Sequence, residues 1–599
     1  MGTRGLSIVR FRGRYYVRYN RYDSYFEGLG AEIVASVPAD PEGYRKWLDL
    51  MRATYAAKER VLDQHVYAIR DGMTPDYSLF SEFVELPSEL PRLADYDTEY
   101  FYIINLDHEI LTMNFGIHWQ LGNIPRQDDL WIRAIADGIH WRSPTISLDI
   151  CPEEHMASPA LELPTPDFQI GCAFKAVTPK TDITDVRQVF LTCVLAKTLI
   201  QYMDTIICFG REWSPESFPF RELAFALVSI ASGQAKFHSF PAQRCNPRSC
   251  ARWDCKLSHL PKSCGWLNEK WAGDCAPLLE FGSASHRPGD PPGASPAETM
   301  YWLEDVLVSL TLVVDGEAIT KAVTWGIEKQ GRRDFQGVVL SLFEVAFVEV
   351  FFDDGDEEPS IKISKSVSLS PLRAAYCVST HPRERPALKP GMKVQYNRGE
   401  VIMRSNCTGS AESLRDQFPG LMSLVHFFEI AARRRAASKP SVLHPFLNPP
   451  EAVASCGTAS KSPIVLLPKL QNRILDFVDN DTWKACSVVS RSFRSYCLQR
   501  FRLDDRMNIV AGPFVEDYKG PQLSFDFEDT QTEEISRKML SPSLSSTKEC
   551  NWMPVIGSDR KALMLYTIVQ FEPVPGPSEP NEKESTGHAD EKVHGDNSH

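Results

Sequence analysis

The residues with the clearest potential for metal chemistry are five cysteines within one short segment. They are Cys245, Cys250, Cys255, Cys264 and Cys275, with His238 and His259 nearby. A tetrahedral zinc site needs about four thiolate or imidazole ligands. The cysteines are separated by four, four, eight and ten residues, so no Cys-x-x-Cys pair is present. We therefore expect unligated thiols in an irregular loop and no cofactor. The alternative is a structural zinc site, for which Cys245, Cys250, Cys255 and Cys264 are the candidate ligands.

Basic and aromatic residues alternate at the N-terminus, where no acidic residue occurs before Asp23. The set comprises Arg4, Arg10, Arg12, Arg14, Arg18 and Arg21, with Phe11, Tyr15, Tyr16, Tyr19 and Tyr22. Such a pattern can bind single-stranded nucleic acid. The whole chain, however, has 65 Lys+Arg against 78 Asp+Glu, a net charge of −13. We therefore expect a hairpin with core aromatics and ion-paired arginines rather than a nucleic-acid partner.

Catalytic signatures are absent from the sequence. We find no Gly-x-Ser-x-Gly, Walker, Gly-x-Gly-x-x-Gly or His-Glu-x-x-His motif. Thr3 could act as an N-terminal nucleophile only with its own free amine, and removal of Met1 would expose Gly2 instead. His108-Glu109 and Asp23-Ser24 are isolated pairs. We expect no enzyme, and keep an enzyme or ligand-binding protein centred on the N-terminal region as the alternative.

Residues 1–437 must provide the scaffold, and their patterns predict a large mixed α+β body with antiparallel hairpins and helices. Hairpins are expected over residues 6–19 and 100–113. Asp40-Pro41 is typical of a helix start, and the apolar residues behind it recur at helical spacing. Val306–Val314 predicts a strand, whereas Val338–Phe352 fits either two buried strands or one helix and one strand.

A further helix is predicted from the spacing of apolar residues between Leu414 and Ile430. It ends in Arg433-Arg434-Arg435. These arginines fit either a nuclear localisation signal or basic residues that interact favourably with the negative, C-terminal end of the helix dipole. The apolar run from Val189 to Gly210 contains Lys197, Gln201 and Asp204, so we expect a buried helix and no membrane span. No apolar signal segment follows Met1. The 15 cysteines are therefore expected to be mostly free thiols of a cytoplasmic or nuclear protein.

Residues 463–505 predict three short helices. Pro468 can begin the first, which places Leu470, Ile474, Phe477 and Val478 on one face. Asp481 can cap the second helix, and Ser490 can cap the third. The apolar residues of the second and third helices are Trp483, Cys486, Val489, Phe493, Tyr496, Cys497 and Phe501. A core this small gains stability by docking on a partner.

This segment resembles an F-box. The resemblance is carried by Leu467-Pro468, Leu470, Ile474, Phe477-Val478, Asp481, Cys486-Ser487-Val488-Val489-Ser490-Arg491 and Phe493-Arg494. The second half follows the family pattern closely. In the first half one residue is missing between Pro468 and Ile474, and Asp481-Thr482 replaces the usual Asp-Leu pair. The resemblance covers about 40 of the 599 residues.

The resemblance implies an adaptor that binds a Skp-type protein and presents a protein substrate to a cullin-based ubiquitin ligase, without chemistry of its own. It implies adaptor-binding roles for Leu467, Pro468, Leu470, Ile474, Val478 and Val489. It implies roles in the F-box core for Phe477, Cys486, Arg491 and Phe493. No substrate is identified by the sequence, and a chain that joins two neighbouring proteins is a further alternative.

The N-terminus also resembles a family of uncharacterised fungal proteins. The matching residues are Gly2-Thr3-Arg4-Gly5, Arg14-Tyr15-Tyr16, Tyr19-Asn20, Tyr22-Asp23-Ser24-Tyr25, Gly28-Leu29-Gly30 and Tyr102–Asp107. This resemblance suggests a fungal origin and implies no activity.

The expected organisation has five parts. An α+β body (1–437) is followed by a Ser/Pro-rich linker (438–462), the F-box-like module (463–505), a C-terminal extension (506–570) and an acidic tail (571–599). The tail contains four prolines and almost no apolar residues, so we expect it to be disordered.

Overall fold

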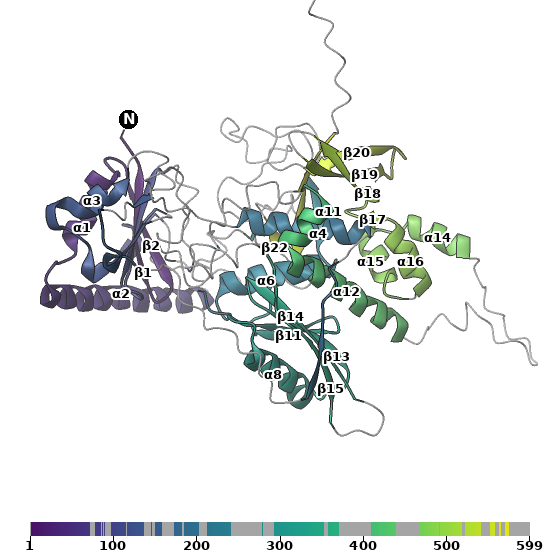
Figure 1. Cartoon of the computed structure of the whole chain (residues 1–599). Coiled ribbons are helices and arrows are strands. Elements are labelled where there is room, and N and C mark those ends of the chain that lie inside the picture. Colours follow the sequence, from purple (N-terminus) through teal and green to yellow (C-terminus); the bar gives the residue numbers. More distant parts are fainter. Residues whose placement is uncertain are drawn as a thin grey trace, which may run out of the picture.

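The computed structural model describes most of the body, the helical module and the C-terminal strands. The described residues are 2–71, 73, 78–84, 87, 89, 98–114, 117–136, 145–146, 150–157, 173–181, 185–202, 206, 213–240, 278–279, 293–352, 358–370, 409–438, 468–489, 491–517, 521–540, 551–557, 562–564 and 569–573. The predicted linker, except for Ser438, lies outside them, as does the predicted tail after Pro573. The chain has an α+β fold with mixed sheets (Figure 1).

The first sheet is N-terminal, with the strand order β2-β1-β3-β4-β5. Its strands are β1 (Gly5–Phe11), β2 (Arg14–Asn20), β3 (Tyr100–Asn105), β4 (Ile110–Met113) and β5 (Ile117–Gln120). Both predicted hairpins are present. Arg12 and Gly13 form the first turn with φ of 50° and 75°, as a two-residue hairpin turn requires. The central β1–β3 pair is parallel.

Helices α1 (Ala31–Ser36) and α2 (Pro41–Arg70) connect β2 to β3 and cover one face of this sheet. The side chain of Asp40 accepts a 2.7 Å hydrogen bond from the backbone amide of Gly43, so the predicted cap of α2 is confirmed. A short helix, α3 (Leu130–Ala134), follows the sheet, and β6 (Ile135–Ala136) pairs with β7 (Thr145–Ile146). The opposite face of the first sheet joins the main core of the molecule.

The second sheet has the order β11-β12-β13-β14-β15-β8, with β16 paired to β14. Its strands are β8 (Phe174–Val177), β11 (Met300–Leu303), β12 (Val306–Leu310), β13 (Phe335–Leu340), β14 (Glu344–Phe351), β15 (Ser360–Ser364) and β16 (Val367–Ser368). The apolar segment 338–352 therefore forms the end of one strand and all of the next, which decides between the two expected arrangements. Helix α8 (Gly316–Thr324) covers one face.

The third sheet combines segments from distant parts of the chain. Its strands are β9 (Lys236–Phe240), β10 (Leu278–Leu279), β17 (Phe501–Arg502), β18 (Met507–Asp517), β19 (Pro521–Asp529), β20 (Ile535–Leu540), β21 (Asn551–Ile556), β22 (Ala562–Met564) and β23 (Val569–Pro573). Strand β9 pairs antiparallel with β21. The C-terminal extension thus shares a sheet with the body, and the first three residues of the predicted tail end β23.

Four helices fill the space between the second and third sheets. They are α4 (Val186–Gln201), α6 (Phe218–Ala231), α11 (Ala411–Gln417) and α12 (Pro419–Ser438). The predicted helix over 414–430 is therefore divided at Phe418. Helix α4 is buried and packs against α6, α12 and β18. Its Phe190 ring lies 5.6–5.8 Å from the rings of Phe237, Phe501 and Phe525, which brings strands β9, β17 and β19 together.

Candidate functional site

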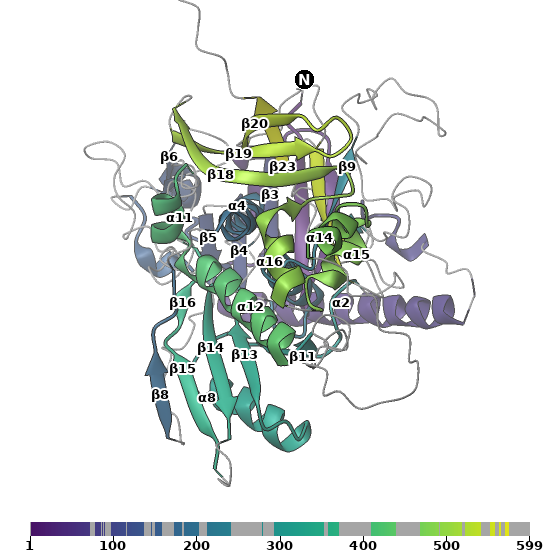
Figure 2. The same ribbon diagram turned by 90° about the vertical axis from the view of Figure 1, so that its right-hand side faces the viewer.

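The predicted F-box-like segment forms a small three-helix module beside α12 (Figure 2). Its helices are α14 (Pro468–Asp476), α15 (Asn480–Cys486) and α16 (Arg491–Gln499). Leu475, Trp483 and Cys497 form the buried centre. Val478, Cys486, Phe493 and Tyr496 are partly buried and pack against that centre.

The cap of α15 differs from the expected one. Asp479, not Asp481, precedes the helix, and its carboxylate accepts a 2.7 Å hydrogen bond from the backbone amide of Thr482. Asp481 lies in the first turn instead, where its side chain pairs with Lys236. The helix begins two residues earlier than expected, so its cap is Asp479.

Apolar side chains of α14 face solvent. Leu470 and Ile474 are each 51% exposed, and Phe477, just after the helix, is 77% exposed. These three residues, spaced i, i+4 and i+7, are called the apolar ridge below. Val489, which follows α15, is 37% exposed. Single exposed apolar residues are ordinary, but three along one short helix resemble an unoccupied interaction surface.

The predicted core position of Phe477 is wrong. The side of α14 that carries Leu475 packs on the module centre, and the side that carries Ile474 and Phe477 points outward. Of the other expected adaptor contacts, Val478 is half-buried against the module centre. Leu467 lies outside the described residues, and so do the side chains of Pro468 and Arg491.

A buried carboxylate forms hydrogen bonds that connect the module to the body. Glu429 of α12 is 3% exposed and accepts hydrogen bonds from Arg187 of α4 (2.6 Å) and Arg494 of α16 (2.8 Å). Arg433 contributes a third bond of 3.0 Å. Burial opposes ionisation, but the arginines outweigh it and hold the pKa of Glu429 below its ordinary value. This cluster could not be predicted from the sequence, because its members come from three distant segments.

Lysine side chains make a second connection between module and body. Lys484 of α15 donates hydrogen bonds to the carbonyl oxygens of Gln234 (3.2 Å) and Ala235 (2.7 Å), just beyond α6. Burial lowers the pKa of Lys484 to about 7. Lys236 pairs with Asp481 at 3.3 Å. Polar contacts therefore contribute to the joint between module and body, beside the apolar packing of Phe501 on Phe190.

Residues that follow α16 hold the end of α14 in place. The guanidinium of Arg502 donates hydrogen bonds to the carbonyl oxygens of Leu475 (3.1 Å), Asp476 (2.9 Å) and Val478 (2.5 Å). The Asp505 carboxylate accepts a 2.6 Å bond from the backbone amide of Asn480. Arg502 thereby satisfies carbonyl groups that a helix end leaves without intrahelical partners.

The N-terminal arginines engage acidic residues of the same chain. Arg10 pairs with Asp107, Arg12 with Glu59, Arg14 with Asp63, and Arg18 with Glu82. Tyr15 and Tyr16 are buried in the sheet. The expected hairpin is present with paired arginines, and Phe11, Tyr15 and Tyr16 are core residues, but Tyr22 is 67% exposed and is not.

The turn between β3 and β4 contains several titratable residues in contact with one another. Glu109 accepts hydrogen bonds from Tyr44 (2.8 Å) and Arg52 (3.2 Å). Burial and the Glu109 carboxylate raise the pKa of Tyr44 above its ordinary value. Asp107 accepts bonds from Arg10 and from the amides of Arg12 and Gly13. Glu109 of the His108-Glu109 pair is thus not isolated. The carboxylates of Asp107 and Glu109 bind arginine side chains of the same chain, which is consistent with a structural role for this turn.

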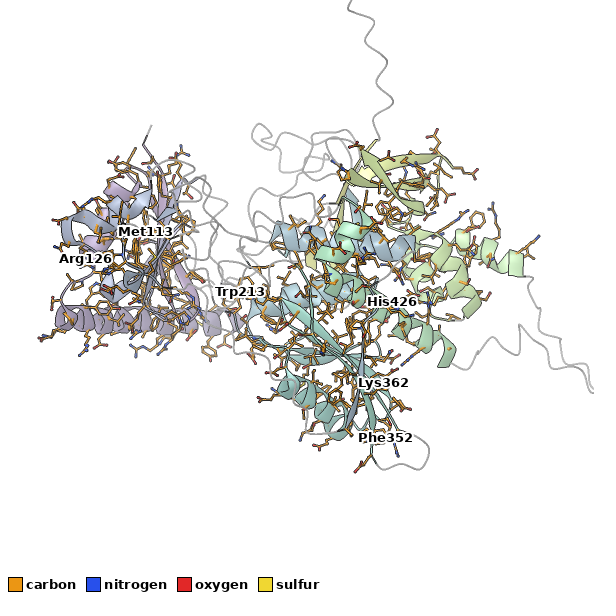
Figure 3. All side chains as sticks on the ribbon, in the orientation of Figure 1. Met113, Arg126, Trp213, Phe352, Lys362 and His426 are labelled. Carbon is orange, nitrogen blue, oxygen red and sulfur yellow. The ribbon has the colours of Figure 1, made fainter. Side chains whose placement is uncertain are left out.

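The arginine triplet at the end of α12 is also ion-paired. Arg433 pairs with Glu429, Arg434 with Glu349, and Arg435 with Glu304. Figure 3 places His426 on the same helix beside the module, and Lys362, a further partner of Glu349, on the second sheet. The triplet therefore connects α12 to its neighbours in the structure.

The zinc candidates Cys245, Cys250, Cys255 and Cys264 lie outside the described residues. The residues that the structure does describe include no group of three or more His, Cys, Asp or Glu side chains arranged to hold a metal ion. Within that same part of the chain, no helix combines the length and the apolar character of a membrane span.

Comparison of the chain with protein-family models, with curated proteins and with solved structures gives no match.

Proposed function

We propose that this chain is an F-box-like adaptor, which binds a Skp-type adaptor protein through the module and presents a protein substrate to a cullin-based ubiquitin ligase. The observation that supports this most directly is the apolar ridge. Leu470, Ile474 and Phe477 face solvent on a helix whose opposite side packs on the module centre. Burying such a ridge against a partner removes apolar surface from water, which favours association.

In this function the chain carries out no chemistry. An adaptor acts by raising the effective concentration of a substrate near the ligase and by restricting its orientation. A fixed joint suits that role, because it converts the position of the bound substrate into a defined position relative to the ligase. The contacts of Glu429, Lys484 and Arg502 would supply that fixed joint. The proposal places the chain in the cytoplasm, the nucleus or both.

The test is capture of the full chain by a purified Skp-type adaptor. We expect direct binding of the wild-type chain, and loss of binding for Leu470→Asp combined with Ile474→Asp, because charged groups on the ridge would have to be desolvated in the complex. Leu50→Asp is the matched control, since Leu50 is an exposed leucine on α2, outside the module. Failure of the wild-type chain to bind, or equal loss with Leu50→Asp, would contradict the proposed function.

A further inference from the structure

Arg126, which lies between β5 and α3, is a half-buried arginine whose side chain has no partner within the described part of the chain. Its Nε–H group is buried and donates no hydrogen bond. Asp128 and Asp129 follow closely in the sequence, but their carboxylates are exposed and neither pairs with Arg126. Burial alone lowers the pKa of Arg126, so no carboxylate lies close enough to oppose that effect.

The isolation of Arg126 is unusual among the arginines of this protein. Each of the other buried or half-buried arginines that the structure describes binds a carboxylate or backbone carbonyl oxygens. They are Arg10, Arg14, Arg52, Arg187, Arg221, Arg332, Arg435, Arg494 and Arg502. A partly desolvated charge without a countercharge is costly. The contrast therefore points to a counterion that comes from outside the chain.

The loop that carries Arg126 is held in one conformation. The carbonyl of Pro125 accepts a 2.7 Å hydrogen bond from the amide of Trp131, and the carbonyl of Arg126 accepts a 3.1 Å bond from the amide of Asp129. Trp131 is 3% exposed and belongs to the core beneath the first sheet. Asp128 and Asp129 have left-handed backbone conformations, with φ of 49° and 54°, which are uncommon outside glycine. A guanidinium on such a fixed loop loses less conformational entropy on binding than one on a mobile loop.

The exposed part of the guanidinium determines which group can bind. Nε is buried and unpaired, whereas the two Nη atoms are not among the buried unpaired atoms, so they reach solvent. Two coplanar N–H groups match the two oxygens of a carboxylate or two oxygens of a phosphate.

The charges around Arg126 favour a carboxylate over a phosphate. From Arg126 to the end of α3 the charged residues are Arg126 and Arg133 against Asp128 and Asp129, which gives a local net charge of zero. The two aspartates repel the second negative charge of a phosphate dianion, and the chain as a whole carries −13. One unpaired positive group in this setting is matched by one negative charge.

We propose that Arg126 is the centre of a binding site for the carboxylate group of a small organic acid, which its two Nη groups bind. Its half-buried position strengthens this ion pair, since the effective dielectric constant is lower there than in water. Figure 3 shows Arg126 in the N-terminal part of the molecule, far from the helical module. The inference is therefore independent of the proposed adaptor function.

The test is titration of the full chain with sodium benzoate in Tris-chloride buffer, followed by saturation-transfer NMR of the benzoate protons. We expect saturable binding with a Kd on the order of 1–10 mM. Arg126→Met should abolish it, and Arg126→Lys should weaken it about threefold or more, because an ammonium group keeps the charge but lacks the planar pair of N–H groups. Arg133→Met is the matched control, since it removes an exposed arginine of α3 and should leave binding unchanged.

Thermal unfolding without benzoate gives a second readout. Arg126→Met should raise the unfolding temperature, because it removes a partly buried charge that has no partner, whereas Arg133→Met should leave it unchanged. An arginine with only a structural role would give a lower temperature when replaced. A lower temperature for Arg126→Met would therefore contradict the proposal.

The remaining outcomes are equally decisive. Absence of saturable binding to the wild-type chain, or binding that survives Arg126→Met, would show that this site is wrong. Phosphate that binds through Arg126 as tightly as benzoate would overturn the preference for a carboxylate. Arg126→Lys covers the case in which Arg126→Met does not fold, because an unchanged affinity in that variant would exclude recognition by the paired Nη groups. Capture by the Skp-type adaptor is a separate measurement, so either proposal can fail alone.

Discussion

Arg494 of α16 donates a 2.8 Å hydrogen bond to Glu429 of α12, and both side chains are almost fully buried. Arg187 of α4 binds the same carboxylate oxygen at 2.6 Å. One carboxylate thus binds two guanidinium groups from elements that lie far apart in the sequence. This contact makes the helical module and the body a single connected structure.

Replacing Glu429 should therefore destabilise the whole chain. Glu429→Gln leaves Arg187 and Arg494 buried without a countercharge, for which we expect a loss of about 3 kcal/mol or more in the free energy of unfolding. Denaturant unfolding followed by tryptophan fluorescence measures this, since Trp483 lies in the module. The control is Glu42→Gln, which breaks an exposed pair with Lys46 and should change stability little. Equal effects of the two substitutions would contradict the prediction.

The same carboxylate should make stability depend on pH in the acid range. Its folded-state pKa is lowered, so its stabilising contribution is present above the unfolded value of 4.5 and is lost as the pH falls through the folded value. The charged or titratable groups near Glu429 are Arg187, Arg433, Arg494 and His426. His426 is present in both the wild-type chain and the Glu429→Gln variant. The stability difference between wild type and Glu429→Gln should therefore shrink below about pH 4.5, and a constant difference would refute the assignment.

Lys484 should produce a second rise of stability with pH, above neutrality. Burial lowers its folded-state pKa to about 7 from an ordinary value of 10.5, so the unfolded chain binds one more proton between these values. Stability should rise with pH in this window by up to about 1.4 kcal/mol per unit. Below about pH 7 both states are charged and the cost of burial is complete. Lys484→Met removes this slope, so unfolding of both proteins between about pH 7 and 9 checks it; parallel curves would contradict it.

Two neighbouring residues of α14 test which side of the helix is buried. Leu475→Ala should cost about 2–4 kcal/mol, because it leaves a cavity in the module centre. Ile474→Ala removes a similar volume from an exposed position and should change the free energy of unfolding by less than about 0.5 kcal/mol. Urea unfolding of the two variants gives the comparison. A larger effect at Ile474 would mean that the helix is turned the other way.

Local signals in the sequence predicted local structure well. Asp40-Pro41 predicted the start of α2, and the pattern of residues 6–19 predicted the hairpin of β1 and β2, because a cap or a hairpin is determined by residues close in the chain. The three helices of the module were also predicted. The predicted cap of α15 was Asp481, whereas the structure has Asp479 in that position. These features need no knowledge of the rest of the molecule.

The orientation of α14 could not be predicted in the same way. Leu470, Ile474, Phe477 and Val478 fall on one helical face, which would ordinarily be the buried face. Leu475 is buried instead, because the module centre and Arg502 occupy the other side. Likewise, nothing near Glu429 in the sequence indicates Arg187 or Arg494. The candidate surface was therefore predicted as a segment, while its exposed residues and its attachment to the body depend on contacts between distant segments.

The pairing of β9 with β21 also bears on how the protein is made. Strand β9 ends at Phe240, and its partner begins at Asn551. At about 5–20 residues per second, a ribosome needs roughly 15–60 s to synthesise the segment between them. During that time an edge of the nascent body has no partner strand and is open to incorrect pairing. The body can complete its third sheet only after nearly the whole chain has been translated, so it should depend on chaperones more than its ordinary composition suggests.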